Sequence, residues 1–158
     1  MAAKAPKRIG RYKILGELGR GAMGVVYKAE DPALDRVVAL KTISLAAADG
    51  RKDYEKRFML EAKAAGKLTH PNIVTIFDFG EEGRSLFISM EYVAGVSLGQ
   101  LLRAGRAPLP PASSARMVAE VLRGLHFAHE ATDLAGEALG VVHRDVSPQN
   151  LIVTFDGQ

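Results

Sequence analysis

Three glycines near the start of the chain have the spacing of a phosphate-binding loop. Gly19, Gly21 and Gly24 form a G-x-G-x-x-G pattern, which alone is weak evidence because glycines also mark tight hairpin turns. The residues that follow continue as a strand, so a dinucleotide-binding loop is disfavoured, and no Gly-Lys-Ser/Thr indicates a Walker loop. A glycine hairpin can offer backbone N–H groups to anionic oxygens. Val26 would then be an apolar wall for a flat ring.

A lysine and a glutamate fall where apolar residues are expected. Alternation along residues 36–43 places Lys41 on one strand face with Ala39 and Ile43. In the predicted helix 51–68, Glu61 falls on the apolar stripe. A charge drawn towards a core needs a partner, so the pattern predicts a Lys41–Glu61 ion pair beside the glycine loop, with the lysine placed to bind a phosphate. The alternatives are an edge lysine that reaches water and a glutamate at the margin of the stripe.

The end of the chain carries a third polar cluster. His143, Arg144 and Asp145 stand between two apolar runs, and Asn150 follows Asp145 by five residues. Polar groups at strand junctions are costly unless they have partners or a function. The spacing therefore marks a candidate site, without assigning a role to either residue.

The elements that must position these residues change in kind near residues 93–96. Short β-branched or aromatic runs predict strands at 12–18, 24–30, 36–43, 72–80 and 85–93, with one helix over 51–68. Helices are then predicted at 97–105, with Ser97 as N-cap, and at 114–131, where His129 lies on an apolar stripe and is interpreted as a core histidine. Strands followed by helices indicate an α+β fold.

Composition narrows the classes of function. The chain has 158 residues, 47% of them hydrophobic and 25% charged, which is typical of a globular domain. It has no cysteine, no apolar run long enough to span a bilayer and no signal peptide, so we expect a cytoplasmic protein without a membrane segment. The net charge of +3 arises from basic residues that precede the first acidic residue, Glu17. We therefore predict a basic flexible tail at residues 1–11 and no nucleic-acid partner.

The order of five motifs resembles that of the protein kinases, and is most similar to the eukaryotic-like Ser/Thr kinases of bacteria. The motifs are LGRGAMGVVYKAE, VALK, Glu61 within FMLEAKAAGKLTHPNIV, MEYV and HRDVSPQN. The resemblance covers nearly the whole chain from Tyr12 onward. It implies a kinase-like N-lobe at residues 12–93, with a five-stranded antiparallel sheet and a C-helix, followed by the beginning of a helical C-lobe at residues 94–158.

The resemblance also implies roles for individual residues. ATP and Mg²⁺ would be the cofactors and protein Ser/Thr hydroxyls the substrates. Lys41 would hold the α- and β-phosphates and pair with Glu61, Asp145 would be the catalytic base, and Asn150 would be the magnesium ligand. His143 and Arg144 would support the loop. The residues expected to bind the nucleotide are Leu18, Gly19, Arg20, Gly21, Ala22, Met23, Gly24, Val26, Ala39, Lys41, Met90 (the gatekeeper), and Glu91, Tyr92 and Val93 of the hinge.

Two departures from the family pattern affect what the chain can do. Ser147 stands where the Ser/Thr kinases usually carry a lysine that touches the transferring phosphate, although Pro148 still fits the Ser/Thr pattern. After the HRDVSPQN motif, no Asp-Phe-Gly, activation loop or Ala-Pro-Glu occurs in the 158 residues. We therefore expect a kinase fragment that is inactive alone. The alternatives are a non-catalytic nucleotide-binding module and a signalling-interaction module.

Overall fold

The chain divides into two compact units. The computed structural model describes residues 6–21, 24–44, 51–83, 85–105 and 108–157. The first unit comprises Met1–Lys67 and Thr75–Tyr92, and the second comprises Leu68–Val74 and Val93–Gln158. The segment 68–74, which falls within the predicted N-lobe at residues 12–93, thus belongs to the same unit as residues 93–158. His70 stacks on Phe127 with ring centroids 5.1 Å apart, and Gly124 lets Asn72 approach closely.

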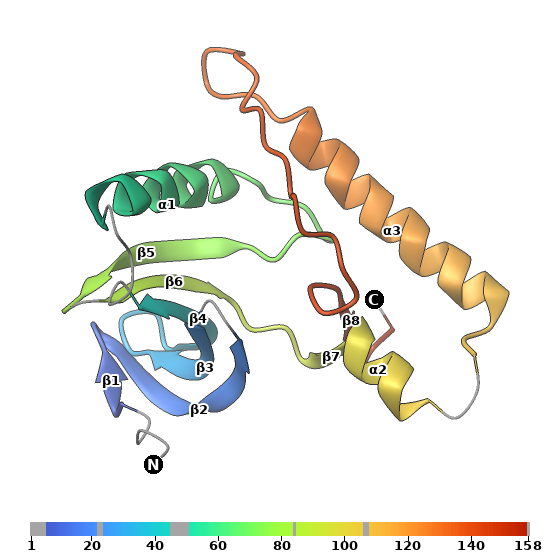
Figure 1. The fold of residues 1–158 in the computed structure, drawn as a ribbon, viewed down its shortest axis with the longest axis horizontal. Helices are drawn as coiled ribbons and strands as arrows, with labels where there is room; N and C mark the ends of the chain where they lie inside the picture. The colour runs from blue at the N-terminus through green and yellow to red at the C-terminus, as the bar shows by residue number, and fades with distance from the viewer. Residues whose placement is uncertain (1–5, 22–23, 45–50, 84, 106–107, 158) are drawn as a thin grey trace. The chain divides into compact units, whose positions relative to one another are not determined.

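The first unit is an antiparallel sheet with one helix along it (Figure 1). Its helix is α1 (Arg51–Ala65), which runs beside β5. Its six strands, in spatial order, are β1 (Arg8–Ile9), β2 (Tyr12–Gly21), β3 (Gly24–Asp31), β4 (Arg36–Ser44), β6 (Ser85–Glu91) and β5 (Ile76–Glu82). All five predicted strands and the helix are present. Strand β5 begins later than predicted because the preceding residues pack with the second unit.

The strand alternation predicted for residues 36–43 is confirmed. Val38 and Leu40 are fully buried on one face of the sheet, in a core with Tyr27 and Ala29 of β3. The opposite face carries a second cluster, in which Phe58 of α1 packs with Leu86, Ile43 and Ile88. Lys41 lies on this second face, between Ala39 and Ile43 along the strand.

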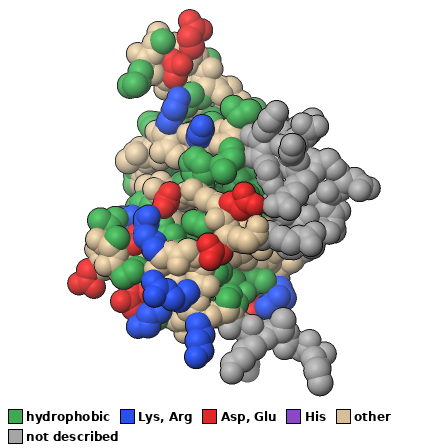
Figure 2. All heavy atoms as spheres, turned by 90° about the vertical axis from the view of Figure 1, so that its left-hand side faces the viewer, with side chains coloured by type: hydrophobic (Ala, Val, Ile, Leu, Met, Phe, Trp, Pro, Cys, Tyr) green, Lys and Arg blue, Asp and Glu red, His purple; other side chains and the backbone are tan. Residues whose placement is uncertain are grey.

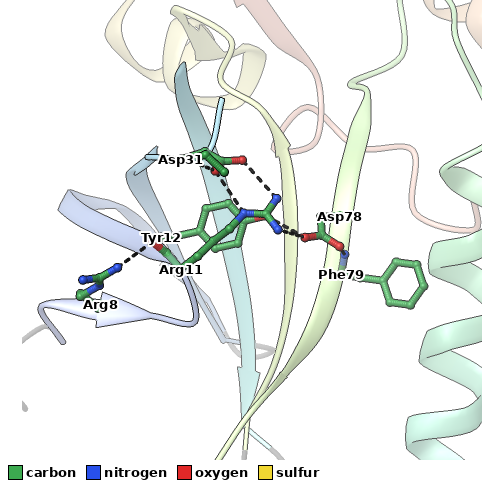
Figure 3. A network of polar contacts seen from close by, with 7 residues as sticks. Arg8, Arg11, Tyr12, Asp31, Asp78 and Phe79 are labelled. Carbon is green, nitrogen blue, oxygen red and sulfur yellow. Dashed lines mark hydrogen bonds and ion pairs between the residues drawn. The ribbon is translucent and has the colours of Figure 1, made fainter. Parts of the chain in front are cut away.

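The predicted flexible tail at residues 1–11 is wrong for its last part. Ile9 in β1 is only 8% exposed and belongs to the main core. The Arg11 guanidinium donates two hydrogen bonds, of 3.1 and 3.2 Å, to the Asp31 carboxylate (Figure 3). It also forms an ion pair of 3.0 Å with the Asp78 carboxylate. The hydroxyl of the buried Tyr12 donates to the same Asp78 at 3.0 Å. The N-terminal segment therefore ties β3 to β5 across the sheet.

The contacts of the N-terminal segment shift the pKa values of two buried groups, Asp31 and Tyr12. Asp31 is fully buried, yet hydrogen bonds from Arg11 and from the backbone N–H of Ala33 keep the pKa of its carboxyl below the ordinary value, against the effect of burial. Burial raises the pKa of the Tyr12 phenol. Asp31 is therefore a paired, ionised group in the folded protein.

Basic side chains on the N-terminal strands lie beside acidic ones. In Figure 2, Lys and Arg gather on the lower part of the face, at the height of β1 and β2 in Figure 1, and acidic side chains accompany them. Lys13 pairs with Glu30 at 3.3 Å and Arg20 with Glu17 at 2.7 Å. These exposed pairs neutralise part of the basic charge on this surface.

The second unit joins two helices to a small ladder. It contains β7 (Gly95–Ser97), α2 (Leu98–Ala104), α3 (Pro111–His129) and β8 (Ile152–Thr154), and β8 pairs antiparallel with β7. The predicted Ser97 N-cap is confirmed, with a complete capping box to Gln100. Among the described residues, no helix is long and apolar enough to cross a membrane.

The apolar stripe predicted for the long helix is confirmed only in part, since Val121 and Leu125 are partly buried. Gly124 and Ala128 are the buried residues of α3, whereas Val118 and Leu122 are more than half exposed. His129 is also exposed, so it is not a core histidine. Gly124 faces the packed side of this helix, where the lack of a side chain lets Asn72 and Ile73 approach the helix backbone.

We expect Asp31→Asn to destabilise the first unit in a pH-dependent manner. At pH 7 the substitution should lower the free energy of unfolding by about 1–3 kcal/mol, because a buried charged acceptor of Arg11 is lost. The wild-type advantage should shrink below about pH 4, because a group with a depressed folded pKa loses its stabilising effect when it becomes protonated.

Denaturant unfolding between pH 7 and pH 3 measures this difference. Glu30→Gln is the matched control, since it removes an exposed ion pair of the same strand and should change stability by only about 0–1 kcal/mol. Equal losses for the two variants at pH 7 would contradict the role assigned to Asp31.

Candidate functional site

The register of three strands gathers the predicted nucleotide residues on one face. Across β3, β4 and β6, Val26 lies opposite Lys41, which lies opposite Ile88. Two residues before Lys41 in β4, Ala39 lies opposite Met90 of β6. Directly opposed residues of an antiparallel pair share a face, so Val26, Ala39, Lys41 and Met90 project to the same side. The structure thus brings together the predicted apolar wall, gatekeeper and lysine.

The glycine-rich segment is a hairpin between strands, as predicted. Gly21 of β2 lies opposite Gly24 of β3, and Gly19 lies opposite Val26. Gly24 has φ +146° and so close an approach to β4 that an added Cβ would lie 1.8 Å from the Thr42 carbonyl oxygen. By contrast, a Cβ on Gly19 or Gly21 would meet open space. The open side suits a bound anion, whereas Gly24 is required by the sheet itself.

The flanking residues of the loop are mostly at the surface. Leu18 is 46% exposed, and the exposed Arg20 side chain bonds to Glu17. Glu17 raises the pKa of the Arg20 guanidinium, chiefly through this hydrogen bond. The predicted loop residues Ala22 and Met23 lie outside the described residues.

The predicted Lys41–Glu61 ion pair is not formed in this structure. Neither side chain takes part in an ion pair with any described residue, and Glu61 is exposed. The buried residues of α1 on this side are Phe58 and Ala62, so Glu61 lies on the flank of the helix. The assumption of two inward-facing charges was wrong, because Glu61 is solvated and Lys41 is only partly buried.

The predicted hinge begins at the end of β6. Glu91 forms two hydrogen bonds with Thr75, one through its backbone and one through its side chain. The Glu91 N–H donates to the Thr75 carbonyl at 2.9 Å, and the Glu91 carboxylate accepts from the Thr75 N–H at 3.3 Å. Tyr92 is the last residue of the first unit, and Val93 is the first of this segment in the second unit. The anchored backbone fixes where the sheet ends and the connection begins.

In the second unit, Asp145 and Asn150 are in direct contact. The Asn150 side-chain amide donates to the Asp145 carboxylate at 2.8 Å and to its carbonyl oxygen at 3.0 Å. The Asp145 N–H donates to His143 Nδ1 at 3.3 Å, and the Asn150 N–H to the Ser147 carbonyl at 2.9 Å. Arg144, which lies between His143 and Asp145, has φ +62°, an uncommon left-handed conformation that turns the chain at this point. Both predicted residues are therefore held on one tight, exposed loop.

Helix α2 holds this loop by its first backbone amides. The N–H of Leu98 donates to the Leu151 carbonyl and that of Gly99 to the Pro148 carbonyl, both at 2.7 Å. The first N–H groups of a helix have no partner within the helix, so the loop supplies the acceptors that α2 needs. Gly95 in β7 allows the close ladder with β8, since a Cβ there would lie 2.3 Å from the Val153 carbonyl. Sequence reasoning missed this anchorage.

The loop fits a magnesium ligand in part. The Asn150 amide nitrogen is used on Asp145, which leaves its amide oxygen as the atom suited to a hard cation. Among the described residues, no three His, Cys, Asp or Glu side chains gather as a metal site. Magnesium is commonly held by one or two protein ligands together with phosphate and water, which agrees with so sparse a donor set.

Comparisons with known proteins identify the family. The protein kinase domain family matches residues 12–158. The chain is 43% identical over 147 residues to the serine/threonine-protein kinase PknD of Mycobacterium tuberculosis, covering 93% of this chain and 21% of PknD. It is 39% identical over 152 residues to PrkC of Bacillus subtilis, covering 96% and 22%. This chain belongs to the protein kinase family.

Further relatives and a solved structure agree on the fold. MasK of Myxococcus xanthus, named a tyrosine-protein kinase, is 40% identical over 157 residues, covering 94% of this chain and 24% of MasK. The kinase domain of M. tuberculosis PknI superposes with a TM-score of 0.79 at 34% identity, covering 96% of this chain and 58% of that domain. The chain thus has the protein-kinase fold and spans about a fifth to a quarter of the curated relatives named here.

We expect Gly24→Ala to disrupt the glycine hairpin and Gly21→Ala to be tolerated by the fold. A methyl group at Gly24 collides with the backbone of β4, so stability should fall by more than about 2 kcal/mol. At Gly21 the methyl group meets open space, so the change should stay within about 1 kcal/mol. Thermal unfolding of the two variants measures the difference, and similar losses in both would show that Gly24 is not packed as described.

Proposed function

We propose that this chain carries the ATP-binding and catalytic-loop residues of a protein kinase that transfers the γ-phosphate of ATP to Ser or Thr hydroxyls of proteins. The observation that carries the proposal is the Asp145–Asn150 contact on a loop anchored by α2. Phosphoryl transfer asks the protein mainly to position groups and to balance charge. A carboxylate held 2.8 Å from the amide of a candidate metal ligand is suited to that task.

In this proposal the residues of the sheet and those of the polar loop have separate tasks. The cationic Lys41 binds the α- and β-phosphates, while the open hairpin at Gly19 and Gly21 admits the phosphates to backbone N–H groups. Asp145 would accept the proton of the substrate hydroxyl, and Asn150 holds Asp145 in place while its amide oxygen would be available to hold magnesium. Magnesium supplies the positive charge that the phosphates require.

Ser147 makes the proposed site less cationic than is usual for the family. Its carbonyl accepts from the Asn150 N–H, so the residue supports the loop through its backbone. A serine offers no positive charge to the transferring phosphate, which should lower the stabilisation of the transition state. The proposed acceptor class rests on the relatives named serine/threonine kinases, and a tyrosine hydroxyl, suggested by the name of MasK, is the second candidate.

A non-catalytic nucleotide-binding module is a further candidate, favoured by one observation. Lys41 has no carboxylate partner among the described residues, and the family relies on that partner to set the lysine for catalysis. Binding alone needs only the cation and the open hairpin.

The first test is binding of ATP with magnesium to the 158-residue chain, measured by calorimetric titration. We expect saturable binding that Lys41→Met weakens at least about tenfold, because a cation next to the phosphates is lost. Lys13→Met is the matched control, since Lys13 is on the same sheet but pairs with Glu30 at the surface. An affinity unaffected by Lys41→Met would refute the assigned nucleotide site.

The second test separates a catalytic chain from a binding module. We expect the 158-residue chain to incorporate little labelled phosphate into a generic protein substrate. Clear incorporation that Asp145→Asn abolishes would overturn this expectation and would establish catalysis by the chain alone. Acid hydrolysis of the product then identifies the phosphorylated residue as Ser, Thr or Tyr.

A further inference from the structure

A lysine next to the proposed nucleotide site lies over an aromatic ring of the hinge. The Lys28 ammonium is 4.4 Å from the centre of the Tyr92 ring. Such a contact is attractive because the ring face carries partial negative charge. Both residues are partly buried, so the contact is partly shielded from water.

The strand register explains how the two residues meet. Lys28 lies opposite Ala39, and Ala39 lies opposite Met90, two residues before Tyr92. All three opposed residues share the face that carries the proposed nucleotide residues. Ala39 is small, so the long Lys28 side chain can pass it and reach beyond the end of β6.

The remaining contacts make the ring the principal partner of Lys28. Lys28 forms no ion pair with any described residue, whereas Lys13, on the neighbouring strand, pairs with Glu30. The residue before Tyr92 is already held by Thr75 from the other side. The start of the hinge is thus fixed at Glu91 by hydrogen bonds and at Tyr92 by the cation.

We propose that Lys28 and Tyr92 form a positioning pair for the nucleotide base. The pair fixes the conformation of the backbone at residues 91–93, so that the N–H and C=O groups of this backbone can bind the flat base. Neither side chain of the pair contacts the phosphates. The inference rests on the proposed function, because it concerns the base side of the same ATP site. It makes Lys28 a determinant of affinity for the base, which the sequence motifs do not assign.

The test compares ATP with inorganic tripolyphosphate, each with magnesium, as ligands of the 158-residue chain. Lys28→Met and Tyr92→Leu should each weaken ATP binding about threefold to fivefold and leave tripolyphosphate binding unchanged. Lys28→Arg should retain most of the wild-type ATP affinity, because it keeps a cation over the Tyr92 ring. The double variant should lose little more than either single variant, since both remove the same interaction.

Controls separate this inference from the proposed function. Lys13→Met should leave both affinities unchanged, and Lys41→Met should weaken both. Absence of ATP binding by the wild-type chain would refute the proposed function. ATP binding that responds to Lys41→Met but not to Lys28→Met or Tyr92→Leu would overturn the inference alone. Equal weakening of ATP and tripolyphosphate by Lys28→Met would also overturn it, because Lys28 would then act on the phosphates.

Discussion

The antiparallel register of β3, β4 and β6 is the constraint on which the proposed nucleotide site depends. Since side chains alternate between the two faces of a strand, one register places Val38 and Leu40 in the core and sends Ala39 and Lys41 to the other side. A slip of one residue would bury Lys41 and expose the core. The hydrophobic core therefore fixes the position of the lysine, although the lysine contributes nothing to it.

The second unit positions its polar loop by backbone hydrogen bonds. Most of the polar loop from His143 to Asn150 is exposed, and it is held by the amides of α2 and by the β7–β8 ladder. Both sets of hydrogen bonds use backbone groups that would otherwise have no partner. These are the first N–H groups of a short helix and the N–H and C=O groups at the edge of a three-residue strand. An exposed loop can thus hold a carboxylate and an amide in contact.

The absent Lys41–Glu61 pair shows the limit of reasoning from helical spacing. Residues three or four apart share a helix face, but the width of the buried stripe depends on what packs against it. Here Phe58 and Ala62 face the sheet and Glu61 lies on the flank, in contact with solvent. A solvated carboxylate needs no partner, so the fold is stable without the pair.

Local patterns in the sequence determined the strands, the helix beside them, the N-cap at Ser97 and the glycine hairpin, because alternation, spacing and turn chemistry act over a few residues. The ordered motifs also identified the family. Tertiary structure alone decided that Arg11 reaches Asp31 and Asp78, that α2 anchors the loop of Asp145, and that Lys28 meets Tyr92. These contacts join residues far apart in the chain, and their geometry depends on how whole elements pack.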